Sequence, residues 1–190
     1  PGLSEKLENL EFNMANVCES AFGFVQKMRK EFETDADLEA IKVEYSRLFV
    51  GPYEMTATPY GSVYLEEGRK MMGDSTLDVK TRYREAGLNT AKTFKDAPDH
   101  ISAELEFMYY LIFKEIEAFS KSDTETAIDF IQKQNSFLED HLMFWVPQFT
   151  ANIIENSGTS FYQNLARATK AFIKEDYHMI SSVLTSWQSN

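Results

Sequence analysis

The 190-residue sequence has little cysteine, glycine or proline, and each shortage excludes a class of protein. Its one cysteine, Cys18, allows no intramolecular disulfide and no site of four thiolate ligands. Eight glycines and five prolines are few for a β-protein with many turns, which favours helices. Because no window approaches 18 uncharged apolar residues, we expect no membrane-spanning segment.

Positive charge is also scarce. There are 19 Lys and Arg residues against 30 Asp and Glu residues, a formal net charge of −11. Nucleic-acid binding depends on basic side chains that neutralise phosphates, so this balance argues against a nucleic-acid partner. It also disfavours an anionic membrane surface, whereas a basic peptide or protein is electrostatically favoured.

The N-terminal residues show neither the basic region nor the apolar run of a secretory signal. We therefore expect a cytoplasmic protein, while what preceded Pro1 stays open because the sequence does not start with Met. Cys18 follows Val17 on an apolar helix face, and a buried, inert thiol is the expectation for it.

Apolar residues recur at helical spacing along most of the chain. They predict one long helix from Leu3 to Phe32 and another after Pro98-Asp99, whose buried stripe holds Ile101, Leu105, Met108, Ile112, Ile116 and Phe119. No segment alternates like a strand. The predicted fold is all-α, a single compact domain of roughly eight to ten helices, with the connector at 88–98 as a candidate boundary between two lobes.

The acidic residues are concentrated in one region. Residues 99–140 hold ten acidic and three basic side chains, a net −7, whereas residues 65–95 carry a net +2. An acidic helical face of this kind is either a solvated surface or a docking surface for a cationic partner.

Aromatic residues cluster around the loop predicted between Gly51 and Gly61. They are Tyr45, Phe49, Tyr53, Tyr60 and Tyr64. These rings either close the core beneath the loop or line a groove for an apolar or amphipathic peptide, since tyrosine combines apolar area with a polar tip.

Two pairs at helical spacing could bind a metal, His100 with Glu104 and Glu175 with His178. A di-iron bundle needs two Glu-x-x-His motifs and two further carboxylates, whereas this chain has three histidines and one such motif. We therefore expect neither metal nor other cofactor. A helical metal enzyme using His100, Glu104 and His178 is kept as an alternative.

Six stretches, in four groups, carry the motif pattern of one known family. The first pairs YSRLFVGP (45–52) with PYGSVY (59–64), and the second pairs GDSTL (73–77) with YREAGL (83–88). The third, APDHISAELEFM (97–108), resembles the family's Glu-Pro-x-Asp-His signature, although Asp96-Ala97 stands where Glu-Pro is expected. The fourth is FLEDHLMFWVPQF (137–149).

Together these stretches resemble the TorD/DmsD-type chaperones, a family of redox-enzyme maturation proteins. This resemblance implies an all-helical, non-catalytic chaperone. Such a protein binds the twin-arginine leader of a molybdenum-cofactor oxidoreductase and holds the apoenzyme for cofactor insertion before Tat export. The acidic region suits the arginines of such a leader, and the aromatic cluster suits its apolar stretch. The resemblance leaves open a monomer or a lobe-swapped dimer, and the sequence shows no nucleotide-binding motif.

Carried over by motif, Asp99 and His100 are the residues expected to bind the peptide, with Pro98 setting the backbone. Asp99 either meets an arginine or fixes the loop, and His100 positions it. The expected groove is shaped by Tyr45, Leu48, Phe49, Tyr60 and Tyr64, with further charge from Glu104 and Glu106. A non-catalytic acidic adaptor for another folded protein is the remaining alternative.

Overall fold

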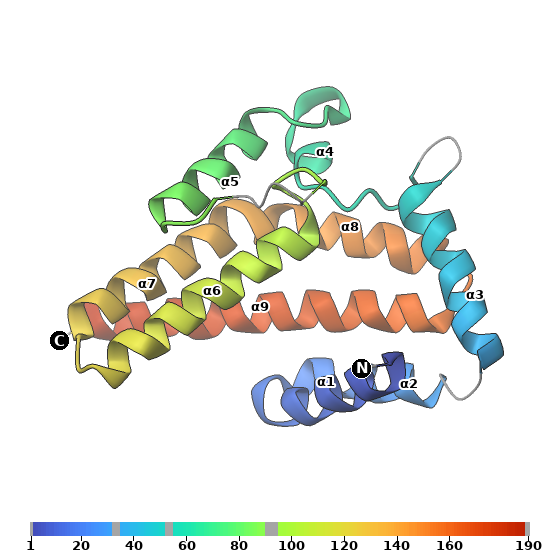
Figure 1. The fold of residues 1–190 in the computed structure, drawn as a ribbon, viewed down its shortest axis with the longest axis horizontal. Coiled ribbons are helices and arrows are strands. Elements are labelled where there is room, and N and C mark those ends of the chain that lie inside the picture. Colours follow the sequence, from blue (N-terminus) through green and yellow to red (C-terminus); the bar gives the residue numbers. More distant parts are fainter. Residues whose placement is uncertain (1, 32–34, 52–54, 90–94, 189–190) are drawn as a thin grey trace. The chain divides into compact units, whose positions relative to one another are not determined.

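Helices form the regular structure of the chain, as the composition predicts. The computed structural model describes residues 2–31, 35–51, 55–89 and 95–188. The only pairing of extended backbone in these ranges is an isolated antiparallel bridge between Tyr60 and His100. The predicted all-α fold is confirmed. The elements in chain order (Figure 1) are α1 (Leu3–Val17), α2 (Glu19–Lys30), α3 (Asp35–Tyr45), η1 (Ser46–Val50), α4 (Ser62–Leu65), η2 (Glu67–Arg69), α5 (Asp74–Glu85), α6 (Ile101–Ser120), α7 (Thr124–Phe137), η3 (Leu138–Leu142), α8 (Met143–Asn156) and α9 (Ser160–Gln188).

The helices group into two units that we describe separately. The first unit holds Pro1–Thr58 and Val146–Glu175, and the second holds Pro59–Trp145 and Asp176–Asn190. The connector at 88–98 belongs to the second unit, and its residues 90–94 lie outside the described ranges. The boundary between two lobes at this connector stays a prediction, and so does the single domain.

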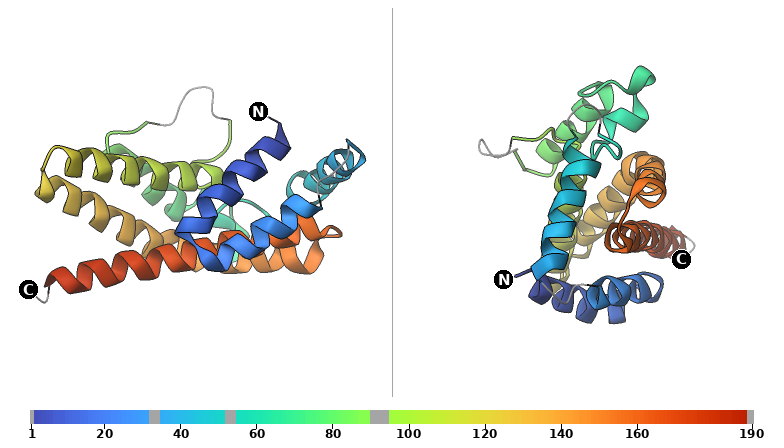
Figure 2. Two further views of the ribbon diagram at one scale, coloured as in Figure 1. Left: turned by 90° about the horizontal axis from the view of Figure 1, so that it is seen from below. Right: turned by 90° about the vertical axis from the view of Figure 1, so that its right-hand side faces the viewer.

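The first unit begins with a helical hairpin. Helices α1 and α2 pack together (Figures 1 and 2), and the chain bends at Cys18, whose backbone is extended at φ −150°. The predicted single helix from Leu3 to Phe32 is therefore wrong, and Phe32 lies outside the described ranges. Cys18 is 2% exposed and packs with Ala21, Val25 and Ala168. The bend buries Cys18 and leaves Val17 exposed, although the apolar pattern runs on through both residues.

Buried Cys18 behaves as the sequence predicts. Burial raises the pKa of its thiol, with an opposing effect from the Ser20 hydroxyl. The thiol donates a hydrogen bond to Glu175 Oε2 at 3.2 Å. A neutral, buried thiol of this kind is a packing residue.

The core of the second unit is built on the pair α6 and α7, which lie side by side (Figure 2). Helix α6 buries Phe107, Met108 and Leu111, together with Glu104 and Ala118. The predicted stripe is wrong at its C-terminal end, since Ile116 is 61% exposed and Phe119 44% exposed. Residues 107–113 are apolar all round the helix, so periodicity alone did not identify the buried face.

No helix in the described ranges has both the length and the apolar character needed to cross a bilayer.

Candidate functional site

The residues of the third sequence motif form a tight turn in the second unit. Segment 59–62 pairs with segment 97–101 through two backbone hydrogen bonds: Gly61 N donates to Asp99 O at 2.9 Å, and Ile101 N donates to Pro59 O at 2.9 Å. Tyr83 Oη on α5 donates to Pro98 O at 2.9 Å. Two stretches about 40 positions apart thus form one local structure, which we call the His100 turn (residues 59–62 and 97–101).

Tyr60 and His100 lie across from one another on the His100 turn. Their rings are 5.1 Å apart in an edge-to-face arrangement, and Tyr60 Oη donates to Asp96 Oδ1 at 2.9 Å. His100 Nδ1 accepts from Ser102 N, so His100 is the N-cap of α6, which begins at Ile101 rather than Asp99. Burial lowers the pKa of the His100 imidazole, against the opposing charges of Asp96 and Asp99. The imidazole is therefore neutral near pH 7 and partly accessible.

Asp99 and Glu104 lie beneath this pair of rings. Asp99 is 1% exposed and its Oδ2 accepts from Ser62 N at 2.7 Å, close to the first turn of α4. Glu104 is 0% exposed and its Oε2 accepts from Trp145 Nε1 at 2.9 Å. Burial raises the pKa of the Glu104 carboxyl well above its usual value, and the nearby Asp99 charge raises it further.

Gly61 is required at the centre of the turn because there is no space for a side chain. A Cβ built on it would lie 3.1 Å from Trp145 Nε1 and 3.3 Å from Glu104 Oε1. Trp145 also stacks on Tyr64, with ring centres 5.7 Å apart. The motif at 59–64 and the Trp of the last motif therefore serve one packed site, which explains why both belong to the same pattern.

The structure thus brings together six of the predicted site residues in the second unit: Tyr60, Tyr64, Pro98, Asp99, His100 and Glu104. Asp99 fixes the loop, the second of its two expected roles. Glu104 offers no surface charge, unlike the expectation for it. Glu106, two residues further along α6, is exposed.

The other three predicted residues lie in the first unit. Leu48 is 0% exposed, whereas Tyr45 is 50% exposed. The Phe49 ring lies 5.2 Å from Tyr45, 5.6 Å from Tyr162 and 6.2 Å from Phe149. These rings form an aromatic cluster with one exposed tyrosine at its edge. Tyr53, also part of the predicted cluster, lies outside the described ranges together with Pro52.

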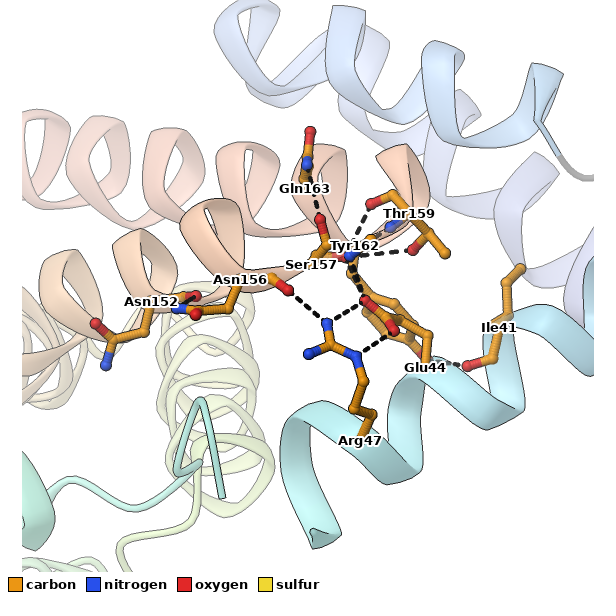
Figure 3. A network of polar contacts seen from close by, with 10 residues as sticks. Ile41, Glu44, Arg47, Asn152, Asn156, Ser157, Thr159, Tyr162 and Gln163 are labelled. Atoms are coloured by element: carbon orange, nitrogen blue, oxygen red, sulfur yellow. Dashed lines mark hydrogen bonds and ion pairs between the residues drawn. The ribbon is translucent and has the colours of Figure 1, made fainter. Parts of the chain in front are cut away.

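A buried carboxylate next to this cluster was missed from the sequence. Glu44 on α3 is 7% exposed and accepts from Arg47 through both oxygens, at 2.7 and 2.8 Å (Figure 3). Its Oε1 also accepts from Ser157 Oγ at 3.0 Å and Gly158 N at 2.6 Å. Arg47 also donates to Asn156 O. This Glu44 network ties α3 to the loop between α8 and α9. The i,i+3 spacing of Glu44 and Arg47 was its only sign in the sequence.

A polar cavity of about 420 Å³ between α5 and α7 was also missed. Its walls carry charged residues of both signs, and most of them are already paired: Arg82 with Asp78, and Lys133 with Asp129. Arg82 also reaches Asp140 and Ser136. The i,i+4 spacing of Asp78 and Arg82 could have indicated the first of these pairs.

The metal site of the alternative enzyme hypothesis does not form. Glu104 is fully buried against Trp145, whereas His178 on α9 is exposed. Among the described residues, no three His, Cys, Asp or Glu side chains gather in a geometry suited to a metal ion.

The sequence of this helical protein matches that of a known family. A family model described as the nitrate reductase delta subunit matches residues 11–151, most of the chain. The protein therefore belongs to this family, and the predicted membership of the TorD/DmsD-type group is confirmed.

Its relatives include proteins named chaperone protein TorD. The chain is 28% identical over 148 residues to that of Vibrio parahaemolyticus serotype O3:K6, a match covering 78% of this chain and 67% of the relative. It is 30% identical over 142 residues to that of Photobacterium profundum, covering 75% and 64%. The chain thus spans about two thirds of the length of these relatives. They are named as chaperones, in agreement with the prediction of a protein that is not an enzyme.

Proposed function

We propose that this protein is a non-catalytic chaperone for the maturation of a molybdoenzyme, and that it binds the twin-arginine leader of its client. Family membership and the name shared by its relatives support the chaperone role. The observation that carries the proposal is the His100 turn, where the motif residues converge. In this proposal the protein acts in the cytoplasm and holds the apoenzyme until the cofactor is inserted, before Tat export.

In this proposal two carboxylates at the turn, Asp96 and Asp99, have different roles. Asp99 is buried and committed to Ser62, so it shapes the turn instead of meeting the leader. Asp96 is exposed and next to Tyr60, which makes it the carboxylate available to an arginine. A guanidinium there would gain a charge-assisted hydrogen bond, and the partly accessible rings of Tyr60 and His100 offer a flat contact surface.

The apolar part of the leader has a counterpart in the first unit. Tyr45 is half exposed at the edge of the cluster that Phe49 and Leu48 anchor from inside. In our proposal Tyr45 contacts the apolar stretch of the leader, while Leu48 and Phe49 hold Tyr45 in place. Glu106, exposed on α6, adds long-range attraction for a cationic peptide.

Calorimetry with the full protein and synthetic leader peptides tests the proposal. The leader of the oxidoreductase encoded beside its gene should bind, and the affinity should fall as salt is added, since paired charges are screened. We expect Asp96→Asn and His100→Ala each to weaken binding by about tenfold, that is about 1.4 kcal/mol. Asp123→Asn, which changes an exposed carboxylate at the start of α7, is the matched control for charge.

Two results would overturn this proposal. One is a lack of binding to every twin-arginine leader encoded near the gene. The other is binding that depends equally on Asp96 and Asp123, which would indicate attraction to overall charge without a defined site.

A further inference from the structure

Two buried carboxyl oxygens at the His100 turn have no hydrogen-bond partner in the part of the chain that the structure describes. They are Asp99 Oδ1 and Glu104 Oε1, on side chains that are 1% and 0% exposed. Buried polar atoms in folded proteins are almost always paired, so two unpaired acceptors in one site need an explanation. A carboxyl oxygen that carries a proton becomes a donor, so a protonated carboxyl could pair with a neighbouring carboxylate oxygen.

The two carboxyls converge on the same few backbone atoms. Asp99 Oδ2 accepts from Ser62 N, and Glu104 Oε1 lies 3.3 Å from the position of a Cβ built on the adjacent Gly61. The outer oxygen of Glu104 is already used by Trp145 Nε1. The Asp99 charge acts directly on the Glu104 carboxyl. Each carboxyl thus has one bonded oxygen and one buried oxygen for which the described residues supply no partner.

The described groups that lie around this pair, Tyr83, Trp145 and His100, supply no positive charge. Tyr83, from α5, is held neutral by burial, which raises the pKa of its hydroxyl. Trp145, from α8, does not titrate. Burial lowers the pKa of the His100 imidazole and keeps it neutral. Two other charged groups nearby, Asp96 beside His100 and Glu106 on α6, are acidic and exposed. The Asp99 charge opposes ionisation of the buried Glu104 carboxyl, as happens in other pairs of neighbouring carboxyl groups.

We propose that Glu104 is protonated and donates this proton to Asp99 Oδ1, and that the shared proton positions the Tyr60–His100 pair for its ligand. One proton would satisfy both orphaned oxygens and join the first turn of α6 to Ser62 through Asp99. When Glu104 loses the proton to solvent at high pH, two buried anions face each other and the turn loosens. Glu104 is then a positioning residue, and the role of the turn in leader binding rests on the function proposed above.

The direct test is infrared spectroscopy of the full-length protein, which detects a protonated carboxyl through its C=O stretch. At a pH near 8, the wild type should show this band, and Glu104→Gln should lack it. Asp176, whose pKa burial raises to about 6, is ionised at that pH and does not interfere. Asp99→Asn should shift the band, because the acceptor of the proton has changed. Absence of the band from the wild type would overturn the proposal whether or not any variant folds.

The pH profile gives a second, independent readout. Gln keeps a donor for Asp99 and an acceptor for Trp145, so Glu104→Gln should stay folded and bind the leader within about twofold of wild type near pH 7. The urea midpoint of the wild type should fall as the pH rises above 4.5 toward the raised pKa of Glu104, and Glu104→Gln should lack this decrease. Glu104→Ala should weaken leader binding by at least about tenfold. Glu125→Gln, at an exposed position in the first turn of α7, is the matched control and should keep the wild-type pH profile of the urea midpoint.

The proposal would be contradicted if Glu104→Gln bound the leader as weakly as Glu104→Ala and if its urea midpoint kept the pH dependence of the wild type. The infrared and unfolding measurements need no leader. If no leader binds but the infrared C=O band and the pH dependence of the urea midpoint are both found, the proposed function is wrong and the shared proton is supported.

Discussion

Glu44 in the first unit and Glu104 in the second are both buried glutamates, and the protein holds them in opposite states. Glu44 accepts from Arg47, Ser157 and Gly158, and these donors, Arg47 first, lower its pKa to about 2 despite burial. Glu104 has one protein donor, Trp145, and burial raises its pKa. The charge of the donors at Glu44 and the depth of burial at Glu104 therefore set opposite directions for the two carboxyl pKa values.

The largest effect is expected when the satisfied carboxylate is removed. Glu44→Ala leaves the Gly158 N–H and Ser157 hydroxyl without their acceptor and Arg47 without its partner, and should destabilise the protein by about 2–4 kcal/mol in urea unfolding. Glu39→Ala, which removes an exposed carboxylate on the same helix, should change stability by no more than about 0.5 kcal/mol. Equal losses for the two variants would show that the network does not stabilise the fold.

The pH dependence of stability should have opposite signs for the two residues. The folded pKa of Glu44 lies below its usual 4.5, so its contribution is present above pH 4.5 and is lost as the pH falls toward about 2. This contribution amounts to at most about 3 kcal/mol and should disappear in Glu44→Gln. For Glu104, whose folded pKa is raised, stability should fall as the pH rises above 4.5. If Glu44→Gln still loses stability as the pH falls toward about 2, Glu44 is not the cause of this loss and the comparison is wrong.

Removing the single donor to Glu104 should sharpen the contrast. Trp145→Phe leaves Glu104 Oε2 unpaired inside the second unit, and we expect a loss of about 2 kcal/mol in urea unfolding. Trp187→Phe makes the same chemical change at a site that is 40% exposed and should be close to neutral. If the two variants lose the same free energy of unfolding, the Trp145–Glu104 hydrogen bond contributes nothing to stability.

The smallest effect is expected at the N-cap of α6. His100→Ala removes the acceptor for Ser102 N and should cost about 0.5–1 kcal/mol, whereas His100→Asn should restore most of it because Asn is a good N-cap residue. Thermal unfolding measures both. A larger loss that Asn does not recover would mean that His100 stabilises the turn through its ring and not as a cap.

Much of the architecture could be predicted, and the failures have identifiable causes. The helical pattern and the motif residues of the His100 turn follow from sequence periodicity and from the family resemblance. The break at Cys18 does not, because a side chain supplied from α9 buries Cys18 where the apolar stripe continues. The ionisation of Glu44 and Glu104 also could not be predicted. It depends on Gly158, Ser157 and Trp145, which are distant in sequence from the carboxyls they contact.

The most direct test of the contrast is an NMR titration of the glutamate side-chain carboxyl carbons, with Glu44→Gln and Glu104→Gln used to assign the two signals. We predict that the Glu44 signal titrates near pH 2 and that the Glu104 signal still reports a protonated carboxyl far above pH 4.5. A Glu104 signal that titrates at or below pH 4.5 would contradict the account, because both buried glutamates would then be carboxylates.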